Sequence, residues 1–433
     1  MLNNRKKVLK NDPPSKITRQ RIFLLFILLT LGTLCWYIGK AAGFHTGCNA
    51  DADYAEGVPV YYREETYGNV VQRSPEKLPK AEEDTGFDVR FLDLSVFDLS
   101  EQDELLQEVW FNSKTVWPNK LPEGFIPETV LEEGKNPGLG IRRIHDEGYT
   151  GKGISIAIVD TTLNLDHVEY KDNIKGYELL HAFDEGAGMH GSAVTSIAAG
   201  TSCGVAPNAD IYYIASSFFR IGFFGTKRDL TYMAKSINRI LEINQILPDT
   251  QKISVISISC GFDPNTLDGR KVFNAIEKAK RKNVFVITPS LELNYDVEIR
   301  GLGRPYNEDP DCVESYVPGL FWQKHFYENP EMLNIENTLL IPMDSRTYGD
   351  WESEYGYEFC SRGGLSWAVP WLAGLYALCR EANPSITPEM FLSVALETGT
   401  EKEFSYNGNS YSLGTIVNPS MLIQKIQKEE EAG

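Results

Sequence analysis

Short apolar runs alternate with longer amphipathic segments from about residue 140 onwards. The runs are rich in β-branched residues and are predicted to be strands at 154–159, 211–216, 253–259, 283–288 and 338–342. Helical spacing of apolar residues predicts helices at 190–199, 228–243, 267–282 and 366–378. Continuous apolar strands between such helices predict an α/β fold with a parallel, doubly wound sheet and helices on both faces. In such a sheet the functional groups gather at the carboxyl ends of the strands.

The N-terminus has a different pattern. Residues 1–21 carry seven basic side chains and one acid, and residues 22–38 form an apolar run without a charge. With the small residues that follow, this run is long enough for a helix that crosses a hydrocarbon core of ~30 Å. The excess of basic residues predicts a cytoplasmic tail at 1–21, a transmembrane anchor at 22–42 and an extracellular remainder, with the chain single-pass in the cell membrane. A cleaved signal peptide is the alternative.

Residues 43–140 are acidic, with 20 Asp and Glu against 8 Lys and Arg. The part at 43–115 is predicted to be an acidic stalk, and an inhibitory pro-segment is the alternative. The α/β domain is then expected at 116–425, followed by a charged C-terminal tail at 426–433.

Composition narrows the class of protein. Hydrophobic residues make up 42% of the chain and charged residues 24%, as in globular proteins, which excludes wholesale disorder. The net charge of −18 repels a phosphate backbone, so nucleic acid is not an expected partner. The seven cysteines show no metal-ligand spacing with the six histidines.

Three short segments of the sequence contain residues suited to act as a nucleophile, a base and an acid that orients the base. Asp160 ends the first predicted strand, His190 opens a helix, and Ser366 follows two glycines and a leucine at the start of another helix. Pro370 is expected in the first turn of that helix, where proline is tolerated. A serine hydroxyl needs a base to remove its proton, and a carboxylate holds the imidazole in the required tautomer. These residues are the candidate catalytic triad.

The blocks around these residues resemble the signatures of the subtilisin-like serine peptidases (subtilases). They are GKGISIAIVD, HGSAV and GLSWAVPWLAG, with GVAPNADIYYI after the His helix, and together with the closing GTIVNPSMLI they extend over about residues 137–425. The resemblance implies a subtilisin-like catalytic domain and places substrate-binding backbone at Ser259, Cys260 and Gly261. An extended peptide is then expected to add as a strand there.

Besides Thr161 and Thr162 after Asp160, where Ser-Gly or Thr-Gly is common, three departures from the family pattern concern the catalytic region. Leu365 stands where the family has Thr, and Trp371 where it has His. Leu291 takes the position of an Asn whose side chain donates to the oxyanion, which leaves Ser290 and Asn294 as oxyanion candidates. Losing such a donor lowers turnover about 10²–10³-fold.

The resemblance implies a serine endopeptidase that works through an acyl-enzyme. The N-terminal pattern adds that it is tethered to the membrane and faces outside. Its partners would be a polypeptide substrate in extended conformation and the membrane. A catalytically weak or inactive pseudopeptidase that binds peptides is the alternative, favoured by the three departures. Calcium is common in the family, but the sequence offers no ligand set, and no other cofactor is implied.

Overall fold

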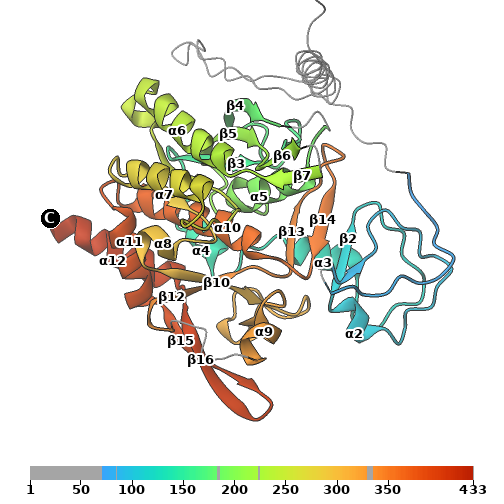
Figure 1. Ribbon diagram of the computed structural model, residues 1–433. Coiled ribbons are helices and arrows are strands. Elements are labelled where there is room, and N and C mark those ends of the chain that lie inside the picture. The colour runs from blue at the N-terminus through green and yellow to red at the C-terminus, as the bar shows by residue number, and fades with distance from the viewer. Residues whose placement is uncertain (1–70, 84, 183–185, 223–224, 329–334, 433) are drawn as a thin grey trace, which may run out of the picture. The chain divides into compact units, whose positions relative to one another are not determined.

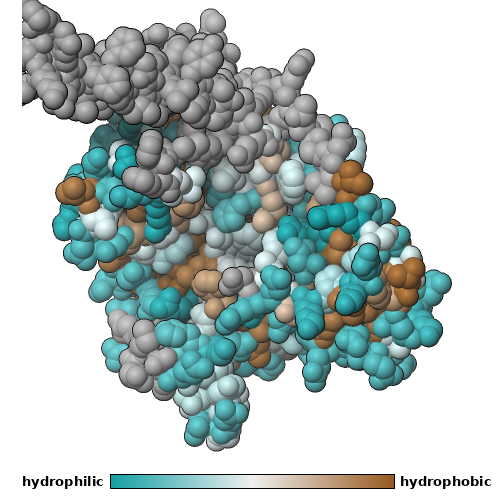
Figure 2. All heavy atoms as spheres, turned by 45° about the vertical axis from the view of Figure 1, so that its right-hand side comes forward, coloured by the Kyte–Doolittle hydropathy of each residue, from teal (hydrophilic) through white to brown (hydrophobic). Residues whose placement is uncertain are grey.

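The computed structural model describes residues 71–432 apart from 84, 183–185, 223–224 and 329–334. The predicted cytoplasmic tail and transmembrane anchor at 1–42 lie outside these residues, as do residues 43–70 and 84 of the predicted stalk. Within the described ranges, no helix combines the length and the apolar character needed to cross a membrane. The face shown in Figure 2 is largely hydrophilic, with apolar side chains in scattered groups.

The central sheet has five strands in the order β4-β5-β3-β8-β9, and every neighbouring pair is parallel. Its strands are β3 (Ser155–Asp160), β4 (Ile174–His181), β5 (Asp210–Ser216), β8 (Ile253–Ser257) and β9 (Phe285–Ile287). All six residues of β3 are buried, as expected for a strand covered on both faces. The parallel α/β sheet predicted from the apolar runs is therefore confirmed (Figure 1).

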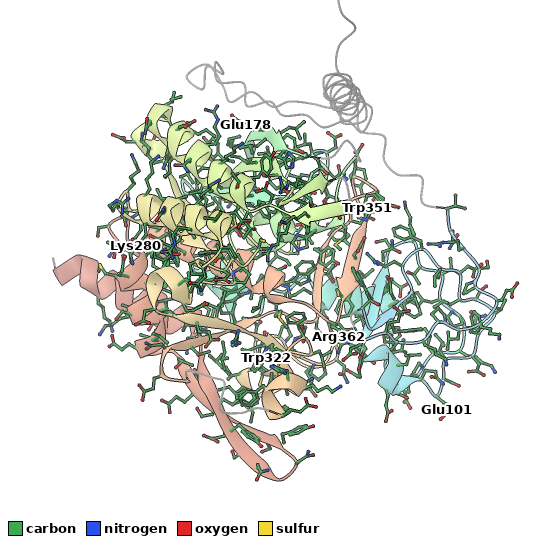
Figure 3. The ribbon with its side chains drawn as sticks, viewed as in Figure 1. Glu101, Glu178, Lys280, Trp322, Trp351 and Arg362 are labelled. Atoms are coloured by element: carbon green, nitrogen blue, oxygen red, sulfur yellow. The ribbon has the colours of Figure 1, made fainter. Side chains whose placement is uncertain are left out.

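Two pairs of helices pack on this sheet. The first pair is α6 (Thr231–Ile246) and α7 (Leu267–Lys280), and the second is α5 (Met189–Ala199) and α10 (Leu365–Ala382). A buried ion pair fastens α6 to β4, because Arg239 donates to both carboxylate oxygens of Glu178 at 2.9 Å (Glu178 is labelled in Figure 3). The second pair matters most for function, since α10 contacts α5, β3 and β8.

The predicted strand at 338–342 forms as β12 (Thr338–Pro342) but in a second sheet. That sheet has the order β11-β10-β12-β16-β15, and β12 runs parallel to β10 and β16. The other strands are β10 (Glu298–Gly303), β11 (Val317–Pro318), β15 (Thr400–Tyr406) and β16 (Asn409–Ile416). The expectation of one sheet for all five runs was wrong, because an apolar run specifies a buried strand and not its neighbour.

The chain before residue 116 is folded where the structure describes it. β1 (Phe87–Asp88) and β2 (Val109–Asn112) join β14 (Tyr357–Cys360) and β13 (Arg346–Gly349) in a sheet of order β1-β2-β14-β13. A small apolar core, which includes Phe87 and Phe111, packs against Phe359 from β14. The predicted domain boundary at residues 115 and 116 stays a prediction, although the chain on its two sides shares this sheet and this core.

The remaining helices are short or lie at the ends of the chain. They are α2 (Asp103–Leu106), α3 (Pro127–Glu133), α4 (Ile141–Asp146), α8 (Glu292–Tyr295), α9 (Gln323–Glu328), α11 (Pro388–Thr398) and α12 (Pro419–Ala432), and the hairpin β6 (Phe219–Gly222) and β7 (Gly225–Arg228) follows β5.

Candidate active site

Asp160 is held at the carboxyl end of β3, at the edge of the central sheet where function was expected. One carboxylate oxygen accepts hydrogen bonds from the Thr161 backbone N–H at 2.8 Å and from the Thr161 hydroxyl at 3.2 Å. The same oxygen lies 2.8 Å from Nδ1 of His190. An ionised carboxylate only accepts hydrogen bonds, so Nδ1 is the donor and Nε2 remains available as a base.

Two glycines let α5 approach β3 closely enough for this contact. A Cβ atom on Gly188 would lie 2.8 Å from the Thr161 hydroxyl, and one on Gly191 would lie 2.5 Å from the Tyr213 hydroxyl. The Gly188 N–H also donates to the Thr162 carbonyl at 2.9 Å. A larger side chain at either glycine would push the helix, and His190 with it, away from the carboxylate.

The electrostatics of His190 follow from this pairing. Burial by itself lowers its pKa, because a charged imidazolium loses hydration. The charge of Asp160 and the hydrogen bond to it act in the opposite direction and prevail, so the pKa of His190 is raised above its ordinary value. The Asp160 side chain is 7% exposed and that of His190 33%, so Asp160 is shielded while the imidazole still reaches solvent.

Ser366 is the second residue of α10, and a proline lies four residues further along the helix. Pro370 is the sixth residue of the helix, so the expectation that it lies in the first turn was wrong. Because proline has no N–H, the carbonyl of Ser366 has no helical partner. The hydroxyl of Ser259 donates to that carbonyl at 2.9 Å, which ties the start of α10 to the end of the β8 segment.

The three triad candidates are only partly brought together. The His190 ring lies 5.4 Å from the ring of Trp367, the residue after Ser366, so α10 begins beside the imidazole. Among the hydrogen bonds of the described residues, none joins the Ser366 hydroxyl to His190. Such bonds are often long in enzymes without substrate. The Asp160–His190 pair is formed, and the complete triad stays a prediction.

Both oxyanion candidates already have other partners. The Ser290 hydroxyl accepts from the Phe262 backbone N–H at 3.0 Å and donates to the Phe262 carbonyl at 3.3 Å. The Asn294 amide donates to Glu277 on α7 at 2.8 Å. Leu291, at the family's Asn position, is buried. Ser366 lies in the first turn of α10, where backbone N–H groups lack acceptors within the helix.

The segment predicted to bind substrate backbone follows β8 directly. The Cys260 N–H donates to the Ile258 carbonyl at 2.8 Å. The Gly261 carbonyl accepts from the guanidinium of Arg228, the last residue of β7. Burial raises the pKa of the Cys260 thiol, so the neutral form is favoured. Sequence reasoning did not identify Arg228, because no local pattern links it to residues 33 positions away.

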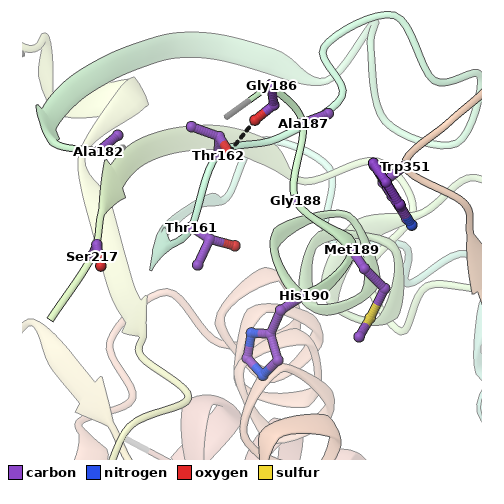
Figure 4. A pocket seen from close by; sticks show the side chains of 10 residues that line it. All are labelled: Thr161, Thr162, Ala182, Gly186, Ala187, Gly188, Met189, His190, Ser217 and Trp351. Atoms are coloured by element: carbon purple, nitrogen blue, oxygen red, sulfur yellow. Dashed lines mark hydrogen bonds between the residues drawn. The ribbon is translucent and has the colours of Figure 1, made fainter. Parts of the chain in front are cut away.

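A pocket of about 400 Å³ opens beside His190. Its wall comes from the loop after β3, the approach to α5 and the chain after β5, as Figure 4 shows, with the Thr162 hydroxyl bonded to the Gly186 carbonyl. The lining residues are Thr161, Thr162, Ala182, Gly186, Ala187, Gly188, Met189, His190, Ser217 and Trp351. The lining is mostly small or apolar, which suits side chains of a bound polypeptide.

No calcium ligand set is assigned. In the part of the chain that the structure describes, no group of three or more His, Cys, Asp or Glu side chains is arranged to hold a metal ion.

Comparison with known proteins gives a family for part of the chain. Residues 151–289 match the family model described as the subtilase family. This segment contains Asp160, His190 and Ser259, whereas Ser366 lies beyond it.

Two curated proteins that are similar to this chain in sequence are both named as proteases. Serine protease AprX of Bacillus subtilis (strain 168) is 24% identical over 301 residues, which cover 62% of this chain and 65% of that protein. Subtilisin-like protease PopC of Myxococcus xanthus (strain DK1622) is 23% identical over 303 residues, which cover 61% and 60%. The chain thus spans less than two thirds of the length of either relative.

Solved structures give similar matches. The prenylagaramide maturation protease PagA matches with a TM-score of 0.46 and 17% identity, over 66% of this chain and 98% of that one. A protease from Pseudoalteromonas arctica matches with a TM-score of 0.46 and 19% identity, over 67% and 95%.

Proposed function

We propose that this protein, whose residues 151–289 match the subtilase family, is a serine endopeptidase that hydrolyses peptide bonds through an acyl-enzyme. The observation that carries the proposal is the hydrogen bond of 2.8 Å between Asp160 and His190 at the carboxyl end of a parallel sheet. The two curated proteases and the subtilisin-like block around Ser366 support it.

In the proposed reaction, Nε2 of His190 removes the proton of the Ser366 hydroxyl as its oxygen attacks the scissile carbonyl carbon. Asp160 stabilises the imidazolium that forms. His190 then gives the proton to the leaving amine, the C–N bond breaks, and the acyl group remains on Ser366. Water, activated by the same imidazole, hydrolyses the ester and restores the serine.

The oxyanion of the tetrahedral intermediate is assigned to the backbone N–H of Ser366. Ser290 and Asn294 remain candidates for a further donor. Ser290→Ala and Asn294→Ala test them, because removal of a true donor lowers kcat about 10²–10³-fold. We expect a much smaller loss for both, since each side chain has the structural partner described above.

Labelling with a fluorophosphonate tests the nucleophile directly. The full chain and its Ser366→Ala variant would be incubated with the probe and, separately, with unfolded casein. Covalent labelling and peptide release that are both lost in Ser366→Ala support the endopeptidase. Peptide binding by a folded chain without labelling contradicts it and favours the pseudopeptidase.

Membrane anchoring through residues 22–42 is part of the proposal and rests on sequence alone. Its support is the charge-free run at 22–38 after a tail with seven basic residues, and it places the catalytic domain outside the cell. Extraction of membranes with alkaline carbonate tests it. An anchored chain stays in the pellet at full length, whereas a chain with a cleaved leader is released and begins after residue 38.

A further inference from the structure

A basic side chain is hydrogen-bonded to a backbone carbonyl that is expected to bind substrate. Arg228 ends β7, and its guanidinium donates to the Gly261 carbonyl and lies 3.1 Å from the Cys260 sulfur. Cys260 and Gly261 belong to the segment expected to pair with an extended peptide. A peptide strand at this edge needs the Gly261 carbonyl as an acceptor, so it has to displace the guanidinium.

The β6–β7 hairpin determines which of its side chains faces this segment. In its register Phe219 is paired with Arg228, and Arg220 is paired with Lys227. Paired residues share a face of a two-stranded sheet, and consecutive residues point to opposite faces. Phe219 therefore flanks Arg228, whereas Lys227 carries its charge on the other face.

The charge of Arg228 is not neutralised in the described residues. Arg220, which is paired with Lys227 in the hairpin, has Asp229 at 3.8 Å, but no ion pair of the described residues includes Arg228. The side chain is exposed, although the chain as a whole has a net charge of −18. Within the described residues this guanidinium has a carbonyl and a thiol as its hydrogen-bond partners, and such a group gains from a carboxylate partner.

We propose that Arg228 makes the protein selective for polypeptide segments with an Asp or Glu side chain near the cleaved bond. This inference rests on the proposed function. When a backbone N–H of the substrate replaces the guanidinium as the donor to the Gly261 carbonyl, the guanidinium forms a bidentate ion pair with the acidic side chain of the substrate. A neutral or basic segment has to displace Arg228 without that compensation. Since Ser259 contacts Ser366, the acid is expected about two residues from the cleaved bond, at roughly 3.3 Å per residue.

Quenched fluorescent peptides test the inference on the full chain in detergent. One parent sequence would carry Asp, Ala or Lys at each of the three positions on either side of the cleaved bond. The proteins compared are the unmodified chain, Arg228→Ala, Arg228→Glu and the matched control Lys227→Ala. The control loses one positive charge from the opposite face of the β6–β7 hairpin. Binding of the same peptides to Ser366→Ala, with and without Arg228→Glu, would be followed by fluorescence anisotropy.

We expect Asp to be preferred over Ala about fivefold in kcat/KM at one position, as for an exposed ion pair. Arg228→Ala should abolish this preference and lower KM for the Ala peptide, because the Gly261 carbonyl becomes free. Arg228→Glu should favour the Lys peptide, and Lys227→Ala should retain the preference for Asp.

The outcomes separate this inference from the proposed function. Cleavage without a charge preference, or with one that survives Arg228→Glu, overturns the acidic selectivity and leaves the peptidase standing. Absence of cleavage and labelling, together with acidic binding that depends on Arg228, overturns the peptidase and leaves the selectivity standing. Absence of both, in a folded chain, overturns both.

Discussion

Replacing Asp160 by asparagine separates the electrostatic role of the carboxylate from its shape. Asparagine has nearly the same size, and its carbonyl oxygen can still accept from the Thr161 N–H. What disappears is the negative charge 2.8 Å from Nδ1 of His190. We expect a folded protein with a much lower kcat.

The magnitude follows from the burial of the pair. A hydrogen bond to a charged partner contributes about 1.5–3 kcal/mol, which corresponds to roughly 10–10²-fold in rate. The asparagine amide can also turn its NH₂ group toward the ring and favour the unproductive tautomer. The equivalent change in the chymotrypsin-type triad lowers kcat about 10⁴-fold. We therefore expect a loss in kcat between about 10-fold and 10⁴-fold.

The pH profile of kcat/KM is the decisive assay. Activity needs neutral His190, so the rate of the parent should rise with pH through the raised pKa of this residue. In Asp160→Asn only burial remains, which lowers the pKa, so the midpoint should move to lower pH. The control is Asp166→Asn, which removes the same charge from an exposed loop position. An unchanged midpoint, or a loss below tenfold in a folded variant, would refute the reasoning.

Three further predictions concern stability. Arg239→Ala leaves Glu178 buried without its partner and should cost about 3–5 kcal/mol in urea unfolding, whereas replacing both residues by methionine should recover most of it. Burial raises the pKa of Glu358 to about 7, so its contribution to stability is present below pH 4.5 and is lost as pH rises through 7. The unfolding free energy measured at pH 5 and at pH 8 should therefore differ in the parent protein, and Glu358→Gln should remove the part of that difference that comes from Glu358. Deleting residues 1–115 removes β2 and exposes the edge of β14, so it should lower the melting temperature or cause aggregation. A stable, monodisperse fragment would contradict this.

The local features of this protein could be predicted from its sequence. The strand that ends at Asp160 was evident because a short, β-branched apolar run has few other stable conformations. The helices that carry His190 and Ser366 were evident from small residues, helical spacing and a glycine-rich start. The types of residue in the candidate site followed from chemistry, because a hydroxyl, an imidazole and a carboxylate have complementary roles.

Contacts between distant segments could not be predicted in this way. Nothing in the run at 338–342 shows that β12 pairs with β10 and β16 instead of the central sheet, since any strand edge offers the same backbone groups. The pairing of β2 with β14 accompanies an apolar core in which residues between Phe87 and Val130 pack with Tyr306 and Phe359 from much later in the chain. The prediction of a stalk at 43–115 did not identify this pairing, because apolar alternation does not specify which distant strand β2 joins in addition to β1.

The sequence by itself determined the main strands and helices of the α/β domain and which side chains are able to do the chemistry. The tertiary structure decided that Asp160 and His190 are bonded, that Ser290 and Asn294 are engaged elsewhere, and that Arg228 covers the Gly261 carbonyl. The physical reason is range: propensity and periodicity act within a few residues, whereas these contacts depend on how whole strands and helices pack.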